Sequence, residues 1–277
     1  KNFLKCSLYL RSVIQNLRVT LIQSNLYWEN IPANLEMFSE KISSAGETDL
    51  IVLPETFSTG FSLNPTFAKE MNGSSVDWMK KAAAEKNCVI TGSLIIKERG
   101  KTFNRLIWMQ PNGEFFTYDK RHLFSFSDEH KFFTSGKERI IVELKGWKIC
   151  PLICYDLRFP VWSRNRKAEY DLLIYVANWP ERRSYPWKQL LIARAIENQA
   201  YVVGVNRVGN DGNDIYHSGD SMVADALGNI FYHRIDEEDV STVSLNYESL
   251  KEVREQFQFL KDADDFAINP KTKFKSH

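Results

Sequence analysis

The stretch K-I-C-P-L-I-C-Y-D-L-R-F-P, residues 148–160, decides the fold class of this chain. Its first part is mostly apolar and predicts a buried strand over residues 147–153, and the polar run after it predicts a turn into a helix over residues 159–166. In an open α/β sheet, functional side chains stand at the carboxyl ends of such strands. Cys154 occupies that position, so the pattern predicts an α/β fold with a thiol at a strand end.

Cys154 by itself leaves two interpretations open. A cysteine beside an apolar strand is usually a small buried hydrophobic residue, and this is what we expect of Cys88 and Cys150. The polar Y-D-L-R that follows Cys154 favours a reactive thiol instead, because the amides at a helix start stabilise a thiolate.

Two further apolar segments end on a charged side chain. D-L-I-V-L-P-E, residues 49–55, ends on Glu55, and E-F-F-T-Y-D-K, residues 114–120, ends on Lys120. A partly desolvated carboxylate has a raised pKa and suits a general base, while an ammonium beside a thiol favours thiolate and stabilises an oxyanion. Taken alone, either group can equally be a solvated surface charge.

The composition excludes several classes of protein. The chain has 277 residues and a formal net charge of +1, with acidic and basic residues mixed throughout. A nucleic-acid-binding surface needs a basic excess, which this chain lacks. No apolar run is long enough to span a membrane. No sequence motif for a catalytic metal is present, so we expect neither a metal nor another cofactor.

The cysteines and the N-terminal residues are used to predict the cellular compartment of the protein. The chain has four cysteines: Cys6, Cys88, Cys150 and Cys154. Their spacing fits neither a zinc site nor a disulfide framework, so we expect free thiols, a reducing compartment and a cytoplasmic protein. Residues 1–16 are expected to be an N-terminal extension rather than a secretory signal, because charged residues interrupt the apolar ones.

Predicted strands and helices alternate along the chain without a linker or repeat. Strands are expected at residues 17–24, 50–53, 89–96, 102–110, 113–118, 139–143, 147–153, 172–177, 201–205, 221–226, 230–233 and 240–245. Helices are expected at residues 32–44, 76–86, 159–166, 185–198 and 250–259. The alternation predicts one α/β domain over residues 17–260. The polar tail, residues 261–277, is expected to be loose or to pack on a partner subunit.

Two other motifs, a Cys-His dyad and a phosphate-binding loop, are less well supported by the sequence. His122 and His130 could form a Cys-His dyad with Cys154, but both stand in a segment rich in other polar residues, where a solvated or capping histidine is expected. The segment G-N-D-G-N, residues 209–213, lacks the strand-to-helix context of a phosphate-binding loop and is interpreted as a turn.

Three segments together resemble the signature segments of the nitrilase (carbon-nitrogen hydrolase) superfamily, in its order and spacing. They are L-P-E-T-F (53–57), Y-D-K-R-H-L-F (118–124) and I-C-Y-D-L-R-F-P (153–160). Further matches are A-N-W-P (177–180), A-R-A-I-E-N (193–198) and N-R-V-G (206–209). Within the superfamily these segments resemble the omega-amidases, most closely those of the bacterial YafV type.

The resemblance implies a four-layer α-β-β-α sandwich, a homodimer and a Glu-Lys-Cys triad. By motif, Glu55 is the implied general base, Lys120 the cation that stabilises the oxyanion, and Cys154 the nucleophile. The second glutamate of the family matches Glu129, which helps to position the lysine or the substrate.

The same resemblance implies a small-molecule substrate, a short dicarboxylic monoamide such as 2-oxoglutaramate or 2-oxosuccinamate, cleaved through a cysteine thioester. The backbone N–H of Tyr155 would bind the oxyanion, and Arg158 would bind the free carboxylate unless it pairs with Asp156. The expected pocket wall consists of Phe61, Phe124 and Trp179, which can equally be core residues. A carbamoyl-amine hydrolase, another aliphatic amidase and a non-catalytic binding protein remain alternatives.

Overall fold

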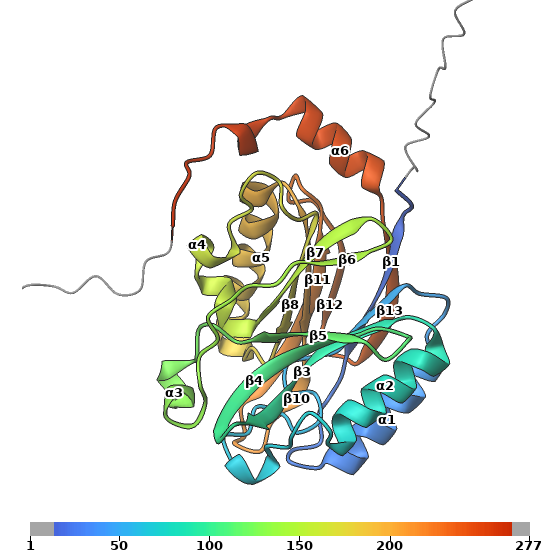
Figure 1. The fold of residues 1–277 in the computed structure, drawn as a ribbon, viewed down its shortest axis with the longest axis vertical. Helices are drawn as coiled ribbons and strands as arrows, with labels where there is room; N and C mark the ends of the chain where they lie inside the picture. The colour runs from blue at the N-terminus through green and yellow to red at the C-terminus, as the bar shows by residue number, and fades with distance from the viewer. Residues whose placement is uncertain (1–13, 268–277) are drawn as a thin grey trace, which may run out of the picture.

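The computed structural model describes residues 14–267, which form two β-sheets packed face to face, with helices on both outer faces (Figure 1). This arrangement confirms the four-layer α-β-β-α sandwich. Residues 1–13 of the expected N-terminal extension and residues 268–277 of the expected tail lie outside the described residues. The domain limits at residues 17 and 260 stay a prediction.

The first sheet has six strands in the order β13-β1-β2-β3-β4-β5. The central β1, β2 and β3 are parallel, and the strands on either side are antiparallel to their neighbours. The strands are β1 (Leu17–Gln23), β2 (Leu50–Val52), β3 (Val89–Glu98), β4 (Lys101–Met109), β5 (Phe115–Asp119) and β13 (Asp239–Leu245). Helices α1 (Ile31–Ser44) and α2 (Ser74–Lys86) cover the outer face of this sheet (Figure 1).

The second sheet has seven strands, with β10-β11-β9-β8-β7-β6 in order and β12 paired with β11. The strands are β6 (Val142–Leu144), β7 (Trp147–Ile153), β8 (Leu172–Ala177), β9 (Tyr201–Asn206), β10 (Val208–Asn210), β11 (Tyr216–Ala224) and β12 (Ile230–Ile235). The other helices are α3 (Glu129–Phe132), α4 (Pro160–Ser163), α5 (Ser184–Asn198) and α6 (Tyr247–Gln256). Helix α5 packs on this sheet through β9 and β11.

The core explains why the central strands are apolar runs. In β2, Leu50 and Val52 belong to the cluster between the two sheets, whereas Ile51 and the following Leu53 pack under α1 and α2. Successive side chains of a strand point to opposite faces, so a strand covered on both faces is apolar at every position. Each fully buried Leu or Ile contributes about 1.5–3 kcal/mol, and this burial holds the strand ends in place.

Several predicted elements have different bounds in the structure, among them the strand expected at residues 139–143, which spans Val142–Leu144. Instead of a helix over residues 159–166, the structure has a 3₁₀ turn at Cys154–Arg158 and the single-turn helix α4. The chain leaves α4 because Asn165 N donates to Asn198 Oδ1 at 2.8 Å and so anchors it to the end of α5. The last helix begins at Tyr247, because Asn246 caps it, and the strand expected at residues 221–226 spans Tyr216–Ala224.

Candidate active site

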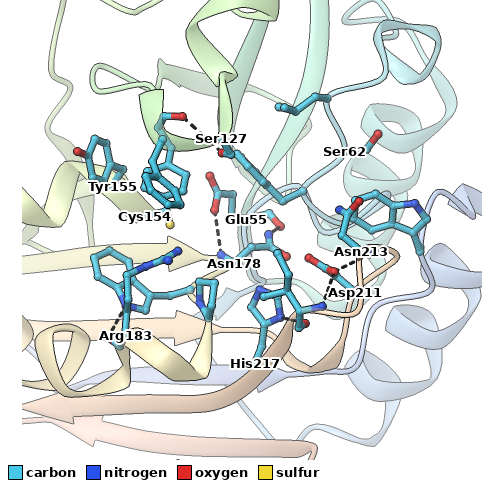
Figure 2. Close-up of a pocket in the computed structure, with 18 of the residues that line it drawn as sticks. Glu55, Ser62, Ser127, Cys154, Tyr155, Asn178, Arg183, Asp211, Asn213 and His217 are labelled. Carbon is cyan, nitrogen blue, oxygen red and sulfur yellow. Dashed lines mark hydrogen bonds between the residues drawn. The ribbon is translucent and has the colours of Figure 1, made fainter.

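The ends of three strands meet at one cavity of about 400 Å³. Glu55 follows β2, Lys120 follows β5 and Cys154 follows β7, and all three line this cavity. Figure 2 shows Cys154 and Glu55 facing the same space, with Asn178 beside Glu55. Glu55 is fully buried, Lys120 is 1% exposed and Cys154 is 8% exposed. The structure therefore brings together the thiol, carboxylate and ammonium that the sequence places at separate strand ends.

Glu55 is held by donors on both carboxylate oxygens. Its Oε1 accepts from Lys120 Nζ and Asn104 Nδ2, each at 2.8 Å, and its Oε2 accepts from Asn178 N at 2.9 Å. A carboxylate oxygen has two lone pairs, so Oε1 is saturated and Oε2 retains one free acceptor site. The free acceptor capacity of Glu55 therefore lies on Oε2.

Lys120 is a buried ammonium between two carboxylates. Its Nζ donates to Glu55 at 2.8 Å and to the two oxygens of Glu129 at 2.9 and 3.1 Å. Burial disfavours its charge, but the negative charges of Glu129 and Glu55 outweigh burial and raise the pKa of Lys120. The amine is therefore a permanent cation at any ordinary pH, and its three protons are engaged by the two glutamates.

Glu129 lies where the sequence predicts it, next to Lys120. It is fully buried, and its Oε2 accepts from Phe124 N at 2.5 Å. Burial raises the pKa of Glu129 against the opposing charge of Lys120. Glu129 thus fixes the direction of the ammonium and ties it to the loop that carries Phe124.

Sequence reasoning missed two asparagines that hold these acids. Asn104 Nδ2 donates to Glu55 at 2.8 Å and contacts Glu129 Oε1 at 3.3 Å, and Asn178 donates to the side chain and the carbonyl of Glu55. Asn104 is a buried polar residue of β4, just before the apolar residues 106–109 of that strand. Such a residue must have a hydrogen-bonding partner.

Cys154 is buried and stands in a short turn, and both features bear on the ionisation of its thiol. It has φ +41° and begins a five-residue 3₁₀ turn, so no long helix starts at the sulfur. Burial and the charge of Glu55 raise the pKa of the Cys154 thiol well above its usual range, although Lys120 opposes the shift. Burial and the charge of Glu55 therefore outweigh the turn amides and Lys120, which were expected to favour thiolate, and the resting thiol is neutral.

The buried carboxylate of Asp156 joins the turn of Cys154 to the segment after Lys120. It accepts from Tyr118 OH at 2.7 Å, His122 N at 3.0 Å, His122 Nδ1 at 2.8 Å and Ile153 N at 3.1 Å. Asp156 therefore does not pair with Arg158, and this alternative is wrong. The contact with Asp156 and a 3.7 Å ring stack on Phe159 account for His122. His130 is exposed and does not line the cavity, so the structure places neither histidine as the partner of Cys154.

The expected substrate-binding residues all line the cavity. Tyr155, Arg158, Phe61, Phe124 and Trp179 surround the space in front of Cys154. The guanidinium of Arg158 lies 4.9 Å from the centre of the Trp179 ring. Within the described residues, no cluster of three or more His, Cys, Asp or Glu side chains could hold a metal ion. In the same part of the chain, no helix has both the length and the apolar character needed to cross a bilayer.

The family is decided by a direct match. The family model described as carbon-nitrogen hydrolase matches residues 18–255, which is most of the chain. The chain belongs to the carbon-nitrogen hydrolase family. This membership confirms the resemblance that the three sequence segments indicate.

Individual relatives of this carbon-nitrogen hydrolase cover nearly its whole length. Omega-amidase YafV of Escherichia coli (strain K12) is 45% identical over 259 residues, which are 91% of this chain and 98% of that protein. A 2-oxoglutaramate amidase of Bacillus subtilis (strain 168) is 34% identical over 239 residues, 84% of this chain and 91% of that protein. XC1258 from Xanthomonas campestris, a CN-hydrolase superfamily protein with an arsenic adduct in its active site, superposes with a TM-score of 0.90 at 43% identity. This superposition covers 92% of this chain and 99% of that one.

His217 forms part of the cavity wall of this hydrolase and was not singled out from the sequence. It is 2% exposed, and its Nδ1 lies 2.9 Å from the carbonyl of Ile215. Burial and the neighbouring charge of Arg207 lower the pKa of His217 to about 4, although Asp211 opposes the shift. The imidazole is therefore neutral at neutral pH.

The pH dependence of unfolding is expected to contain a His217 contribution. The pKa of His217 in the folded protein, about 4, lies below its ordinary value of 6.5. Its contribution to the free energy of unfolding is therefore fully present above pH 6.5 and is lost as the pH falls toward about 4. The loss over this window is about 3 kcal/mol. The His217→Gln variant keeps a donor for the Ile215 carbonyl and should lack this part of the slope in urea unfolding between pH 4 and 7.5. Parallel profiles for the two proteins would contradict this prediction.

Proposed function

We propose that this protein hydrolyses the terminal amide of a short dicarboxylic monoamide, of the 2-oxoglutaramate or 2-oxosuccinamate type, to a carboxylic acid and ammonia. The observation that carries the proposal is the buried Glu55–Lys120 pair in the same cavity as the Cys154 thiol. The relatives named omega-amidase and 2-oxoglutaramate amidase support the choice of substrate class. Amide hydrolysis itself follows from membership of the carbon-nitrogen hydrolase family.

In the proposed first step, the Cys154 sulfur attacks the amide carbon while its proton passes to Glu55. The transfer must accompany the attack, because burial and the charge of Glu55 keep the resting thiol neutral. Oε2 is the receiving oxygen, since Oε1 already accepts from both Lys120 and Asn104. The carbonyl oxygen becomes an oxyanion, to which the backbone N–H of Tyr155 would donate and which the positive charge of Lys120 would stabilise.

In the proposed second half, Glu55 returns its proton to the departing nitrogen, and ammonia leaves. The carbon–nitrogen bond breaks, and a thioester on Cys154 remains. Glu55 then takes a proton from water as the oxygen attacks the thioester carbon. The carbon–sulfur bond breaks, Glu55 returns the proton to the Cys154 sulfur, and the carboxylic acid is released. Glu129 holds the Lys120 ammonium beside Glu55 during the whole cycle, because both carboxylates bind the same Nζ.

The proposed substrate carries a free carboxylate, for which Arg158 is the candidate partner. Arg158 lines the cavity and makes no ion pair within residues 14–267. Phe61, Phe124 and Trp179 would enclose the short carbon chain of the substrate, since all three rings line the same space. Guanidinium groups bind carboxylates with two parallel hydrogen bonds, which gives orientation as well as affinity.

Ammonia release from a panel of amides tests the substrate class. We expect kcat/KM for 2-oxoglutaramate and 2-oxosuccinamate to exceed that for uncharged aliphatic amides by at least roughly tenfold, because one charge-assisted contact is lost without the carboxylate. The Cys154→Ala variant is the control for background hydrolysis. An uncharged amide that is cleaved equally well would reject the omega-amidase assignment. A carbamoylated amine as the best substrate would favour a carbamoyl-amine hydrolase.

A non-catalytic binding protein on the same fold is the alternative from another class. It predicts that the protein binds amides without ammonia release and that iodoacetamide fails to label Cys154. The buried ion pairs at Glu55 and Lys120 weigh against this alternative, because a binding site gains nothing from a base beside a thiol.

We also propose a homodimer in the cytoplasm. The outer surface of α5 and the β11–β12 hairpin expose apolar side chains, including Ile196, Leu227, Ile230 and Phe231. Ile196 packs against the Gly228 turn next to Leu227, so apolar side chains of α5 and of the hairpin turn meet at the surface, as expected of an interface. The three described cysteines are free, which supports a reducing compartment. Sedimentation velocity of the full chain tests the dimer, and a monomer at micromolar concentration would reject it.

A further inference from the structure

Three guanidinium groups without a carboxylate partner among the described residues line the cavity, those of Arg158, Arg182 and Arg183, and Arg182 is the exposed one. Arg158 and Arg183 both line the cavity, and neither makes an ion pair or a side-chain hydrogen bond with the described part of the chain. The acids nearest in the cavity lining are engaged elsewhere. Glu29 accepts from Ser62 Oγ, and Asp211 accepts from two backbone amides. Two adjacent cations therefore face the cavity with their donors unused.

Both arginines are held in place by aromatic rings of the cavity wall. The Arg158 guanidinium lies 4.9 Å from the centre of the Trp179 ring, and the Arg183 guanidinium lies 5.1 Å from that of Phe124. Trp179 Nε1 donates to the Arg183 carbonyl at 2.7 Å, so the same tryptophan supports one arginine through its ring and the other through its indole N–H. Figure 2 shows Arg183 beside the space in front of Cys154.

The backbone around Arg183 is equally fixed. Arg183 N donates to Pro180 O at 3.0 Å, and Trp179 N donates to Asn206 Oδ1 at 2.7 Å. A cation stacked on an aromatic face keeps its in-plane N–H donors free for a ligand. The guanidinium of Arg183 is therefore prepared to donate into the cavity without prior rearrangement.

The electrostatics of this pair are unfavourable in the empty cavity. Burial and the charge of Arg182 lower the pKa of Arg183, and the charge of Arg158 acts in the same direction. Like charges held together in a partly desolvated site raise the free energy of the unliganded protein. A bound anion removes this cost, and a planar carboxylate matches the fork of each guanidinium.

We propose that Arg183 is a second specificity-determining residue, which together with Arg158 binds the free carboxylate of the dicarboxylic monoamide substrate. This inference rests on the proposed function and adds to it the residue that selects charged over uncharged amides. Arg183 acts on substrate binding, and Cys154, Glu55 and Lys120 carry out the bond cleavage.

The test compares two substrates that differ only at the end remote from the amide. Glutaramate carries a carboxylate there, and pentanamide carries a methyl group at the same place. Arg183→Met should lower kcat/KM for glutaramate roughly 10- to 100-fold, mainly through KM, and should change kcat/KM for pentanamide less than about threefold. Pentanamide thus reports whether the variant is folded and catalytically intact.

Two further variants separate the effect of the bidentate guanidinium geometry from the effect of positive charge. Arg183→Lys keeps the charge but loses the bidentate geometry, so its loss of glutaramate selectivity should be intermediate. Arg182→Met removes the exposed arginine of the same cavity lining, which stacks on no aromatic ring of the described residues, and its effect on selectivity should be much smaller. If Arg182→Met reduces the selectivity as much as Arg183→Met, a general positive field explains it and the inference about Arg183 is wrong.

The outcomes distinguish this inference from the proposed function. A native protein that cleaves pentanamide as well as glutaramate rejects the proposed substrate class, whatever Arg183→Met does. A native protein that prefers glutaramate, with the preference retained in Arg183→Met, rejects only the role of Arg183. Equal losses for both substrates in Arg183→Met also reject it, because they indicate a disturbed cavity or an effect on the reacting carbonyl.

Discussion

Intact mass spectrometry of the native protein mixed with substrate is expected to show one added acyl group, and the Cys154→Ala variant is expected to show none. Turnover in that variant should fall on the order of 10⁵-fold or more, because removing the nucleophile of a covalent mechanism removes the whole pathway. Ammonia release gives the rate, and peptide mapping of the adduct gives its position.

The matched control for this variant is Cys88→Ala. Cys88 is buried in the layer under α1 and α2, outside the cavity, so its removal costs packing energy but no chemistry. Thermal unfolding of both variants separates loss of activity from loss of fold. An acyl adduct that persists in Cys154→Ala would exclude Cys154 as the nucleophile.

Glu55→Gln is expected to lower kcat at least on the order of 10³-fold while the fold is retained. In the proposed mechanism this carboxylate takes a proton from Cys154, gives it to the leaving ammonia and takes another from water. General acid–base catalysis typically contributes a rate factor of about 10²–10⁴. An amide of the same shape can perform none of these transfers. Steady-state ammonia release and circular dichroism measure the two parts of this prediction.

The hydrogen bonds around Glu55 add a stability effect to this variant. Both carboxylate oxygens accept from donors, namely Lys120, Asn104 and Asn178. A glutamine amide group must face one of these donors with its own N–H, whichever way it is turned. The unsatisfied contact should cost about 1–3 kcal/mol of unfolding free energy.

The ionisation of Cys154 provides a separate readout for Glu55→Gln. Because burial and the negative charge of Glu55 both raise the pKa of the thiol, removal of that charge should lower it. The pH midpoint of Cys154 alkylation by iodoacetamide should therefore move down in the variant. A variant that keeps most of its activity would show that Glu55 is not the base.

The order of strands along the chain could be predicted in large part from local pattern. Runs such as residues 50–53 and 172–177 are apolar at every position, which is typical of strands covered on both faces. The ends of helices and strands were less predictable, because they depend on capping residues and on hydrogen bonds to segments distant in the sequence. Asn246 starts α6 three residues earlier than the apolar pattern indicates, and Asn198 draws the chain away after α4.

The sequence by itself placed the candidate residues Glu55, Lys120 and Cys154 at strand ends, because apolar pattern and residue type are local properties of the chain. Glu129 was indicated only by the resemblance to the family. Only the tertiary structure decided their state, because pKa values and hydrogen bonds depend on which side chains from distant strands exclude water together. The neutral thiol of Cys154, the hydrogen bonds from Asn104 and Asn178 to Glu55, and the unpaired Arg183 all arise from contacts between segments far apart in the chain.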